Sequence, residues 1–330
     1  MPLTRRGLFA LDFGGRFRAD EPWLRVHRKA MACRFEVTLP RERGEHVVAA
    51  ADALIEADRI EAVLSVFREG TEVSRVNRLG ASGSVAVSSE LFALLERCAW
   101  LHAATEGAFD ITSTPLSRCW GFLEREGRVP NESTLAPARD VVGMRRVRLN
   151  TASHAVAFDK TGVELNFGAI GKGYAVDRVG DRLRRTGARE ALVSAGGSSV
   201  LALGGRNGGW LVDIRSPLLA TERLARVALR HGALGTSGAG EQYVVADGTR
   251  YGHVIDPRSG APAQGVLSST VVTREAAIAD ALSTAFLIGG PELARRYCEA
   301  HKRTLALLVL DDAARSRCLF GRYPGARIEA

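Results

Sequence analysis

Apolar and polar residues alternate along the chain from residue 33 to residue 39, and a helical spacing of apolar residues follows. Alternation places one set of side chains on each face of a strand, so we expect a half-buried strand that ends at Pro40. Between residues 45 and 64 the apolar residues recur at helical intervals, and this stripe predicts a helix packed on that strand. The apolar positions are Cys33, Phe35, Val37 and Leu39 in the strand, and Val47, Ala50, Leu54, Ala57 and Leu64 in the helix.

Further elements follow in an irregular order. Ser88 or Ser89 can cap a helix that runs past Leu101, and a loop dense in hydroxyl groups covers residues 109–116. We expect a charged surface excursion at 124–140, strands at 147–149, 155–158, 191–194, 210–214, 270–273 and 305–310, a turn-rich stretch at 235–265, and helices after Gly173, at 276–288 and from Pro291. Because strands and helices mix without a βαβ rhythm, the pattern favours an α+β fold over a doubly wound sheet. Any two lobes would meet near residue 160.

Composition is that of an ordinary globular chain. Its 330 residues are 46% hydrophobic and 25% charged, which is enough for one large domain or two closely packed lobes. The formal net charge is +8, but the arginines are scattered and only four of the 45 basic residues are lysines. No basic run interleaved with aromatic residues is present, so we expect no nucleic-acid partner. The five cysteines are widely spaced without a C-x-x-C pair, which argues against a disulfide framework and a zinc site.

The N-terminal residues differ in character from the rest. Residues 1–24 have mixed charge and several glycines, and we expect a poorly ordered arm there, followed by a single domain over residues 25–330. Arg5-Arg6 is followed by an apolar stretch that Asp12 interrupts, which is too short for an export signal. We therefore expect no integral membrane segment and favour a cytoplasmic location, with export through this weak twin-arginine-like sequence as the alternative.

One stretch of the chain suits a phosphate group. Residues 164–177 contain three glycines within six positions, at 168, 171 and 173, and an amphipathic helix is predicted to begin just after them. The amide groups at the start of a helix attract anions, and Lys172 would add a point charge. The spacing matches neither the Rossmann nor the P-loop fingerprint.

Three more polar clusters carry candidate chemistry. Gly235-Thr236-Ser237-Gly238 offers hydroxyl groups between glycines, and His253, three residues before Asp256, has a side chain that can exchange a proton near neutral pH. Asp280 and Thr284 are four residues apart on a predicted helix, so their side chains share a face. One carboxylate and one hydroxyl form a sparse site of the kind that Mg²⁺ uses when substrate phosphates complete its coordination. Each cluster alone is equally compatible with a turn, a surface histidine or a polar helix face.

Taken together and in order, these clusters resemble the ApbE family of flavin transferases. The resemblance covers residues 28–290 and rests on Met31-Ala32-Cys33, Leu64-Ser65-Val66-Phe67, Phe109-Asp110-Ile111-Thr112, Gly171-Lys172-Gly173-Tyr174, Gly196-Gly197, Thr236-Ser237-Gly238, His253-Val254-Ile255-Asp256-Pro257-Arg258-Ser259-Gly260 and Asp280-Ala281-Leu282-Ser283-Thr284. It implies mixed, mostly antiparallel sheets flanked by helices, in two intimately packed lobes with the FAD site between them. It also implies an enzyme that uses Mg²⁺ to move the FMN half of FAD onto a threonine or serine of a target flavoprotein, releasing AMP.

The resemblance also implies roles for particular residues. The metal would be bound by the Asp280 carboxylate, the Thr284 hydroxyl and the backbone carbonyl of Ala169. His253 would act as the base or orient the acceptor, and Asp280 would serve catalysis through the metal. The expected FAD-binding residues are Met31, Phe67, Asp110, Glu164, Ile170, Lys172, Asp177, Ser237, His253 and Ile255.

The chain departs from the family pattern at three places. Ala32-Cys33 stands where many relatives have Gly-Thr, Ser198 follows the glycine pair where an acidic or amide residue is common, and Ala239 follows Gly238 where a polar residue is usual. These departures concern contacts to FAD more than the catalytic set. Two other functions fit the same pocket: an FAD pyrophosphatase that releases FMN and AMP, and an FAD-binding protein without turnover.

Overall fold

The computed structural model of the chain describes residues 22–205, 208–219, 221–240, 242–246 and 248–329. Most of the expected N-terminal arm, including its twin-arginine-like sequence, lies outside these residues. The first strand, β1, begins at Trp23, so residues 23 and 24, which we expected in the arm, belong to the sheet. The reason is a pairing partner: β1 is bonded along its whole length to the strand that the alternating pattern predicts, with Trp23 opposite Pro40.

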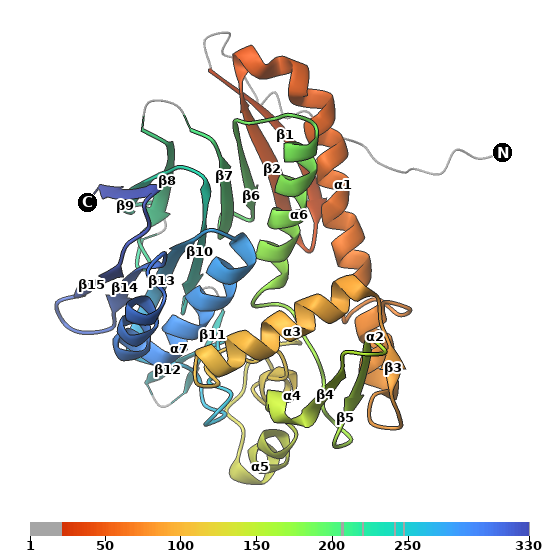
Figure 1. Cartoon of the computed structure of the whole chain (residues 1–330). Helices are drawn as coiled ribbons and strands as arrows, with labels where there is room; N and C mark the ends of the chain where they lie inside the picture. The colour runs from red at the N-terminus through yellow and green to blue at the C-terminus, as the bar shows by residue number, and fades with distance from the viewer. Residues whose placement is uncertain (1–21, 206–207, 220, 241, 247, 330) are drawn as a thin grey trace.

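An eight-stranded antiparallel sheet forms the centre of the molecule (Figure 1). Its strand order is β1-β2-β6-β7-β10-β13-β14-β15. The strands are β1 (Trp23–Ala30), β2 (Cys33–Pro40), β6 (Ala191–Ala195), β7 (Ser199–Leu203), β10 (Gly232–Gly238), β13 (Val266–Thr273), β14 (Leu305–Leu310) and β15 (Arg317–Gly321). All five residues of β7 are buried, which shows that the middle of the sheet is covered on both faces.

Long helices cover one face of this sheet. Helices α1 (Val47–Leu64), α6 (Gly171–Arg185) and α7 (Ala276–Ala300) pack on it through one continuous apolar core, with Phe35, Leu54 and Phe286 fully buried. The other face is covered by a three-stranded sheet of β16 (Ala326–Glu329), β9 (Arg223–Leu229) and β8 (Trp210–Arg215), through a second core around Trp210 and Leu234. The architecture is therefore layered α+β, as the sequence predicts.

A smaller region packs beside the helical layer. It contains α2 (Glu72–Leu79), α3 (Ser89–Ala104), α4 (Thr114–Cys119), α5 (Glu132–Asp140), and a sheet of β3 (Val85–Ala86), β5 (Ala155–Phe158) and β4 (Val147–Asn150). Ser88 caps α3 by accepting a hydrogen bond from the Leu91 amide. The buried face of α3 belongs to the same apolar core as the long helices, so the two regions share one interior.

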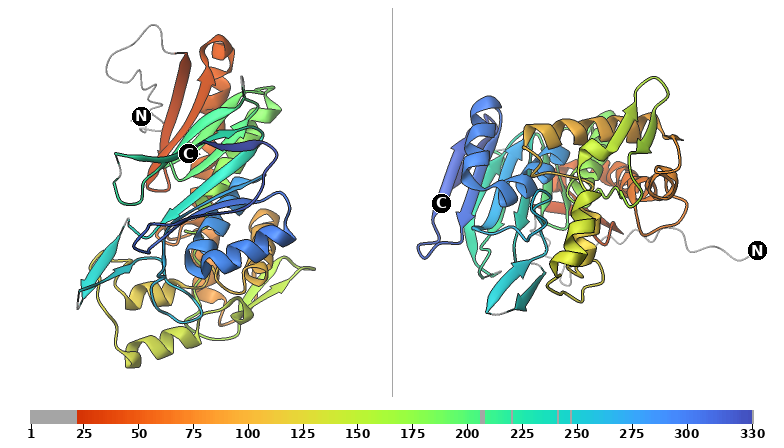
Figure 2. Two further views of the ribbon diagram at one scale, coloured as in Figure 1. Left: turned by 90° about the vertical axis from the view of Figure 1, so that its left-hand side faces the viewer. Right: turned by 90° about the horizontal axis from the view of Figure 1, so that it is seen from below.

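Short elements complete the chain. Two 3₁₀ turns, η1 (Arg41–His46) and η2 (Met144–Arg146), precede α1 and β4. The hairpin of β11 (Tyr243–Ala246) and β12 (Thr249–Gly252) projects at the end of the molecule where α4 and α5 lie (Figures 1 and 2). No helix in the described part of the chain is both long and apolar enough to cross a membrane.

Two stretches that we expected to be loops or turns contain helices or strands instead. The hydroxyl-rich loop contains α4, which begins at Thr114 with Pro115 in its first turn, where proline costs no hydrogen bond. The charged stretch at 124–140 lies at the surface, as predicted, and contains α5, capped by the Asn131 side chain. The turn-rich stretch contains strands β10, β11 and β12. Strand β10 pairs with the distant β13, and β11 and β12 pair with each other as a hairpin. The prediction of two C-terminal helices is confirmed, because α7 is broken at Gly290, where φ is 70°, directly before Pro291.

Candidate active site between the sheet and the small region

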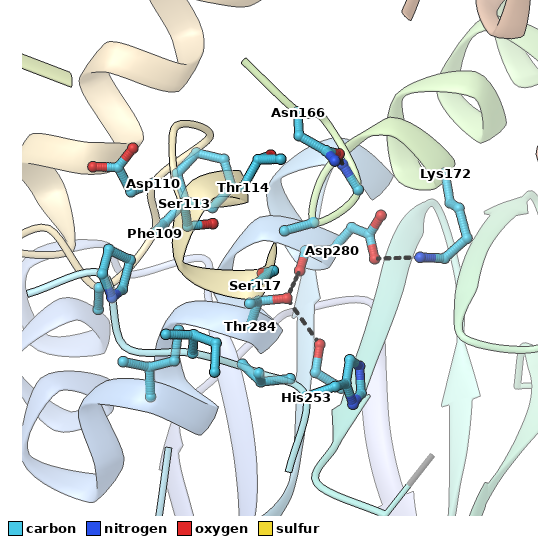
Figure 3. A pocket seen from close by; sticks show the side chains of 18 of the residues that line it. Phe109, Asp110, Ser113, Thr114, Ser117, Asn166, Lys172, His253, Asp280 and Thr284 are labelled. Carbon is cyan, nitrogen blue, oxygen red and sulfur yellow. Dashed lines mark hydrogen bonds and ion pairs between the residues drawn. The ribbon is translucent and has the colours of Figure 1, made fainter. Parts of the chain in front are cut away.

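A cavity of about 350 Å³ lies where the small region meets the ends of β10, α6 and α7. Its walls are formed by residues from five parts of the chain, at 108–117, 166–172, 198, 236–238 and 253–257, and by three residues of α7 (Figure 3). Most of the residues that the sequence singles out line it: Asp110, Ala169, Lys172, Ser237, His253, Ile255, Asp280 and Thr284. Tertiary structure thus brings together clusters that are more than a hundred residues apart.

Asp280 is the buried charge of the site, with only 3% of its surface exposed. Its Oδ2 accepts a hydrogen bond of 3.0 Å from the Gly173 amide, and its Oδ1 accepts one of 3.1 Å from the Ser199 hydroxyl. The Lys172 Nζ lies 4.0 Å from Oδ1, so the two side chains point toward each other (Figure 3). Burial raises the pKa of Asp280, while the Lys172 charge and the two hydrogen bonds lower it. A second cation beside this carboxylate would favour its ionised form.

Thr284 adds a neutral oxygen one helical turn further along α7. Its hydroxyl lies 3.0 Å from the Ser237 hydroxyl and 3.4 Å from the backbone oxygen of Asp280. Ser237, at the end of β10, also lies 2.8 Å from the Ser283 hydroxyl. Asp280, Thr284 and Ser237 therefore form a wall of oxygen atoms. In the described part of the chain no group of three His, Cys, Asp or Glu side chains is arranged to bind a metal ion.

Two glycines allow the backbones around Asp280 to approach each other. A Cβ atom at Gly173 would lie 2.2 Å from the Ala276 backbone oxygen, so α6 and α7 touch backbone to backbone there. A Cβ atom at Gly235 would lie 2.5 Å from the Ala279 carbonyl group, so β10 touches α7 directly. Helix α6 itself begins at Gly171, slightly earlier than predicted. This close packing places Lys172, Ser237 and Asp280 around one space.

Asp177 lies on α6 but does not line the cavity. Its two carboxylate oxygens accept hydrogen bonds from the amides of Ala276, at 2.8 Å, and Ala277, at 2.9 Å. These amides belong to the first turn of α7, where no intrahelical acceptor is available, so Asp177 stabilises the start of that helix. Burial raises its pKa to about 7. Asp177 therefore links α6 to the start of α7 through these two hydrogen bonds.

The remaining predicted FAD-binding residues also lie outside the cavity wall. Ile170 is fully buried in the core, and Phe67 is 80% exposed. Met31, half-buried with φ of 48°, lies beside Gly171. Glu164 forms a two-point ion pair with Arg118, with both distances at 2.8 Å.

His253 enters the cavity from the segment after β12. Its Nδ1 lies 3.3 Å from the backbone oxygen of Gln242. Because a carbonyl oxygen can only accept, a hydrogen bond there places the proton on Nδ1 and leaves the lone pair on Nε2. Asp256, three residues on, instead forms hydrogen bonds of 2.8 Å with the Arg258 guanidinium.

Asp110 holds the segment that closes the cavity on the side of the small region. Its Oδ1 accepts hydrogen bonds from the Thr112 amide and hydroxyl, at 2.7 and 2.6 Å, and its Oδ2 accepts one of 3.3 Å from the Met144 amide. His102 Nδ1 lies 3.2 Å from Oδ2, and this contact raises the pKa of the histidine. Sequence reasoning missed His102, since nothing local marks a histidine at the end of a helix as a partner for Asp110.

Several polar residues of the wall also escaped the sequence analysis as individual assignments: Ser113, Thr114, Ser117, Asn166 and Ser198. The high density of hydroxyl groups between residues 109 and 116 is the signal that could have identified some of them. The Thr114 hydroxyl is buried without a hydrogen-bond partner among the described residues. An orphaned polar atom in a cavity wall is expected where a polar ligand binds.

Comparison with known proteins places this geometry in context. The family model described as "ApbE family" matches residues 31–309. An FAD:protein FMN transferase of Vibrio cholerae is 31% identical over 255 residues, covering 76% of this chain and 75% of that protein. One from Treponema pallidum is 31% identical over 296 residues, covering 84% and 82%. The crystal structure of the ApbE protein from Thermotoga maritima superposes with a TM-score of 0.81 at 27% identity, covering 90% of this chain and 97% of that one.

Proposed function

Since the chain belongs to the ApbE family and is an FAD:protein FMN transferase, we propose that it transfers FMN to a threonine or serine hydroxyl. The acceptor is a flavoprotein, the product is a phosphoester, and AMP is released. We propose that the reaction requires Mg²⁺ bound between the protein and the phosphates of FAD. The observation that carries this proposal is the buried Asp280 carboxylate, which faces a cavity wall of hydroxyl groups and one lysine.

The donor set fits a hard divalent cation. Asp280 and Thr284 would bind it with a carboxylate and a hydroxyl oxygen, and the Ala169 carbonyl in the same wall would be the third protein ligand. Magnesium prefers oxygen donors and commonly keeps places for water and substrate phosphate. Bound there, it would neutralise charge on the pyrophosphate of FAD. The raised pKa of Asp280 supports this assignment, because a cation would offset the cost of burying the carboxylate.

Lys172 and the start of α6 would bind the pyrophosphate. The side chain of Lys172 reaches into the cavity from the first turn of the helix, where amide groups favour negative charge. Its ammonium group lies beside Asp280, so a phosphate bound by Lys172 would lie next to a metal ion held by Asp280. Asp177 and Gly173 act indirectly, by keeping α6 and α7 in contact.

His253 would accept the proton of the acceptor hydroxyl. With Nδ1 bonded to the Gln242 carbonyl, Nε2 is the basic nitrogen. The hydroxyl oxygen forms a bond to the phosphorus that carries the flavin ribityl chain. The bond from that phosphorus to the bridging oxygen breaks, and AMP leaves with that oxygen.

The decisive experiment combines an acceptor, FAD and Mg²⁺ with the wild-type protein and with Asp280→Asn. Mass spectrometry of the acceptor should show the gain of one FMN, with AMP released, for the wild type only, and not when the metal is chelated. Asp181→Asn is the matched control, because this carboxylate lies at the surface of α6 and pairs with Arg184. Full transfer by Asp280→Asn would eliminate the metal assignment.

Replacing His253 separates binding from chemistry. His253→Gln should retain FAD affinity, measured by flavin fluorescence, and lose transfer by about 10²- to 10⁴-fold, the usual contribution of a general base. Loss of FAD binding instead would make His253 a substrate contact. Free FMN and AMP with an unmodified acceptor would identify a pyrophosphatase, and intact FAD would identify a binding protein.

A further inference from the structure

The β11–β12 hairpin grows out of the wall of the candidate active site. Strand β10, which leads to it, ends at the cavity-lining Gly238, and strand β12 ends one residue before His253. The segments that lead into and out of the hairpin therefore both begin at residues of the cavity wall. The hairpin extends away from it at the end of the molecule where α4 and α5 lie (Figure 2). A four-residue strand spans about 13 Å.

One face of the hairpin is fixed to the small region. The Gln242 side chain donates a hydrogen bond of 3.0 Å to the Phe122 carbonyl oxygen. The Tyr251 ring lies 5.4 Å from the Trp120 ring, and Val244 packs against the apolar cluster that contains Trp120 and Phe122. The hairpin is thus anchored on the face that these side chains share.

The opposite face is open and carries two apolar side chains and Arg250. Tyr243 is 49% exposed and Val245 is 61% exposed. The Arg250 guanidinium lies 3.6 Å from the centre of the Tyr243 ring and donates to the Gly240 carbonyl oxygen. The 216–219 loop lies beside Gly240, at the Pro217 carbonyl, and carries Leu218 and Leu219, 54% and 53% exposed. We call Leu218, Leu219, Tyr243 and Val245 the hairpin surface.

In the described part of the chain, neither outer edge of the hairpin pairs with a third strand. The His253 amide donates a hydrogen bond to the Gln242 carbonyl oxygen. In an antiparallel ladder only every second pair of facing residues is hydrogen-bonded, so Val244 and Tyr251 form the next hydrogen-bonded pair. The backbone groups of Tyr243, Val245, Arg250 and Gly252 then point away from the partner strand. Within the described residues no hydrogen bond to these groups is present. An open strand edge beside apolar side chains is suited to adding an extended peptide strand.

We propose that the hairpin surface docks an extended, apolar-flanked segment of the acceptor protein, the segment that carries the target hydroxyl. This inference rests on the proposed function. The enzyme must hold a protein chain within reach of His253, and a segment that follows β11 or β12 is guided along the hairpin to that residue. Apolar side chains flanking the target residue would cover Tyr243 and Val245 on one side and Leu218 and Leu219 on the other.

The test compares the double variant Leu218→Asp/Val245→Asp with Leu319→Asp. Leu319 lies on β15 and is 56% exposed, so it matches the hairpin residues in exposure but not in position. The acceptor is first identified as a protein in a cell lysate that becomes covalently fluorescent when enzyme and FAD are added. It is then purified without bound flavin and used as the substrate. We expect the double variant to raise KM for this acceptor by about tenfold or more, as loss of central interface contacts does, with kcat and FAD affinity unchanged.

Each result bears on one of the two ideas. An unchanged KM in the double variant, or an equal rise in Leu319→Asp, would overturn docking at the hairpin while leaving the transferase intact. Failure of the wild type to modify any protein would instead overturn the proposed function. Sedimentation of the wild type and the double variant tests whether a second copy of the chain binds this surface instead. A dimer that is lost only in the double variant would overturn docking of the acceptor there. The milder Val245→Ser should raise KM in the same direction if Asp at these positions disturbs folding.

Discussion

Replacing Gly173 with alanine should separate two helices on which the candidate active site depends. The new Cβ atom would lie 2.2 Å from the Ala276 backbone oxygen, about 1 Å inside the closest normal contact, and backbone cannot swing aside as a side chain can. Overpacking of this kind costs about 1–3 kcal/mol. The shift would also lengthen the 3.0 Å bond from the Gly173 amide to Asp280, a charged acceptor, at a cost of about 1.5–3 kcal/mol if lost. Alanine has a higher helix propensity than glycine, which would offset about 1 kcal/mol of this loss in stability.

We therefore expect Gly173→Ala to lower the free energy of unfolding by about 2–4 kcal/mol, measured by urea denaturation. FAD affinity should fall as well, because Lys172 and Asp280 no longer face each other at the same distance. Gly180→Ala is the matched control in the same helix. Its Cβ would meet the Leu201 Cδ2 atom at 2.3 Å, the end of a flexible side chain that can rotate away. The reasoning fails if Gly173→Ala is as stable as Gly180→Ala and binds FAD with wild-type affinity.

Two further predictions concern the walls of the cavity. The pKa of His102 is raised by Asp110, so the stability from this pair is complete below the unfolded pKa near 6.5 and is lost as pH rises through the folded value. The difference in unfolding free energy between wild type and His102→Gln should thus shrink from pH 6 to pH 9; a constant difference would contradict this. The Asn77 side chain is hydrogen-bonded to both the amide and the carbonyl of Leu165, at 2.8 and 2.9 Å. Asn77→Ala should therefore lower the free energy of unfolding in urea by about 1–3 kcal/mol, and an unchanged value would contradict this reasoning.

Local patterns in the sequence were sufficient for many of the elements. The alternation from Cys33 to Leu39 predicts strand β2, and the stripe up to Leu64 predicts α1. Asp280 and Thr284 share a face of α7 because their spacing is a property of any helix. These features depend only on neighbours along the chain. Local signals were too weak to predict α4, β10, β11 and β12, and β10 pairs with β7 and β13, which are distant in the sequence.

Only the tertiary structure decided how the clusters face one another. The amide of Gly173 reaches Asp280 over a separation of 107 residues, and Asp177 reaches the start of α7 over 99. Neither contact has a signature in composition, periodicity or spacing, because each depends on the path of the chain between the partners. Long-range packing also decides which predicted residues lie outside the cavity. The motifs suggested that Glu164 and Phe67 line it, but Glu164 pairs with Arg118 and Phe67 is exposed. The sequence by itself thus determined which residue types are available and which share a local element, whereas long-range packing determined which of them meet around one space.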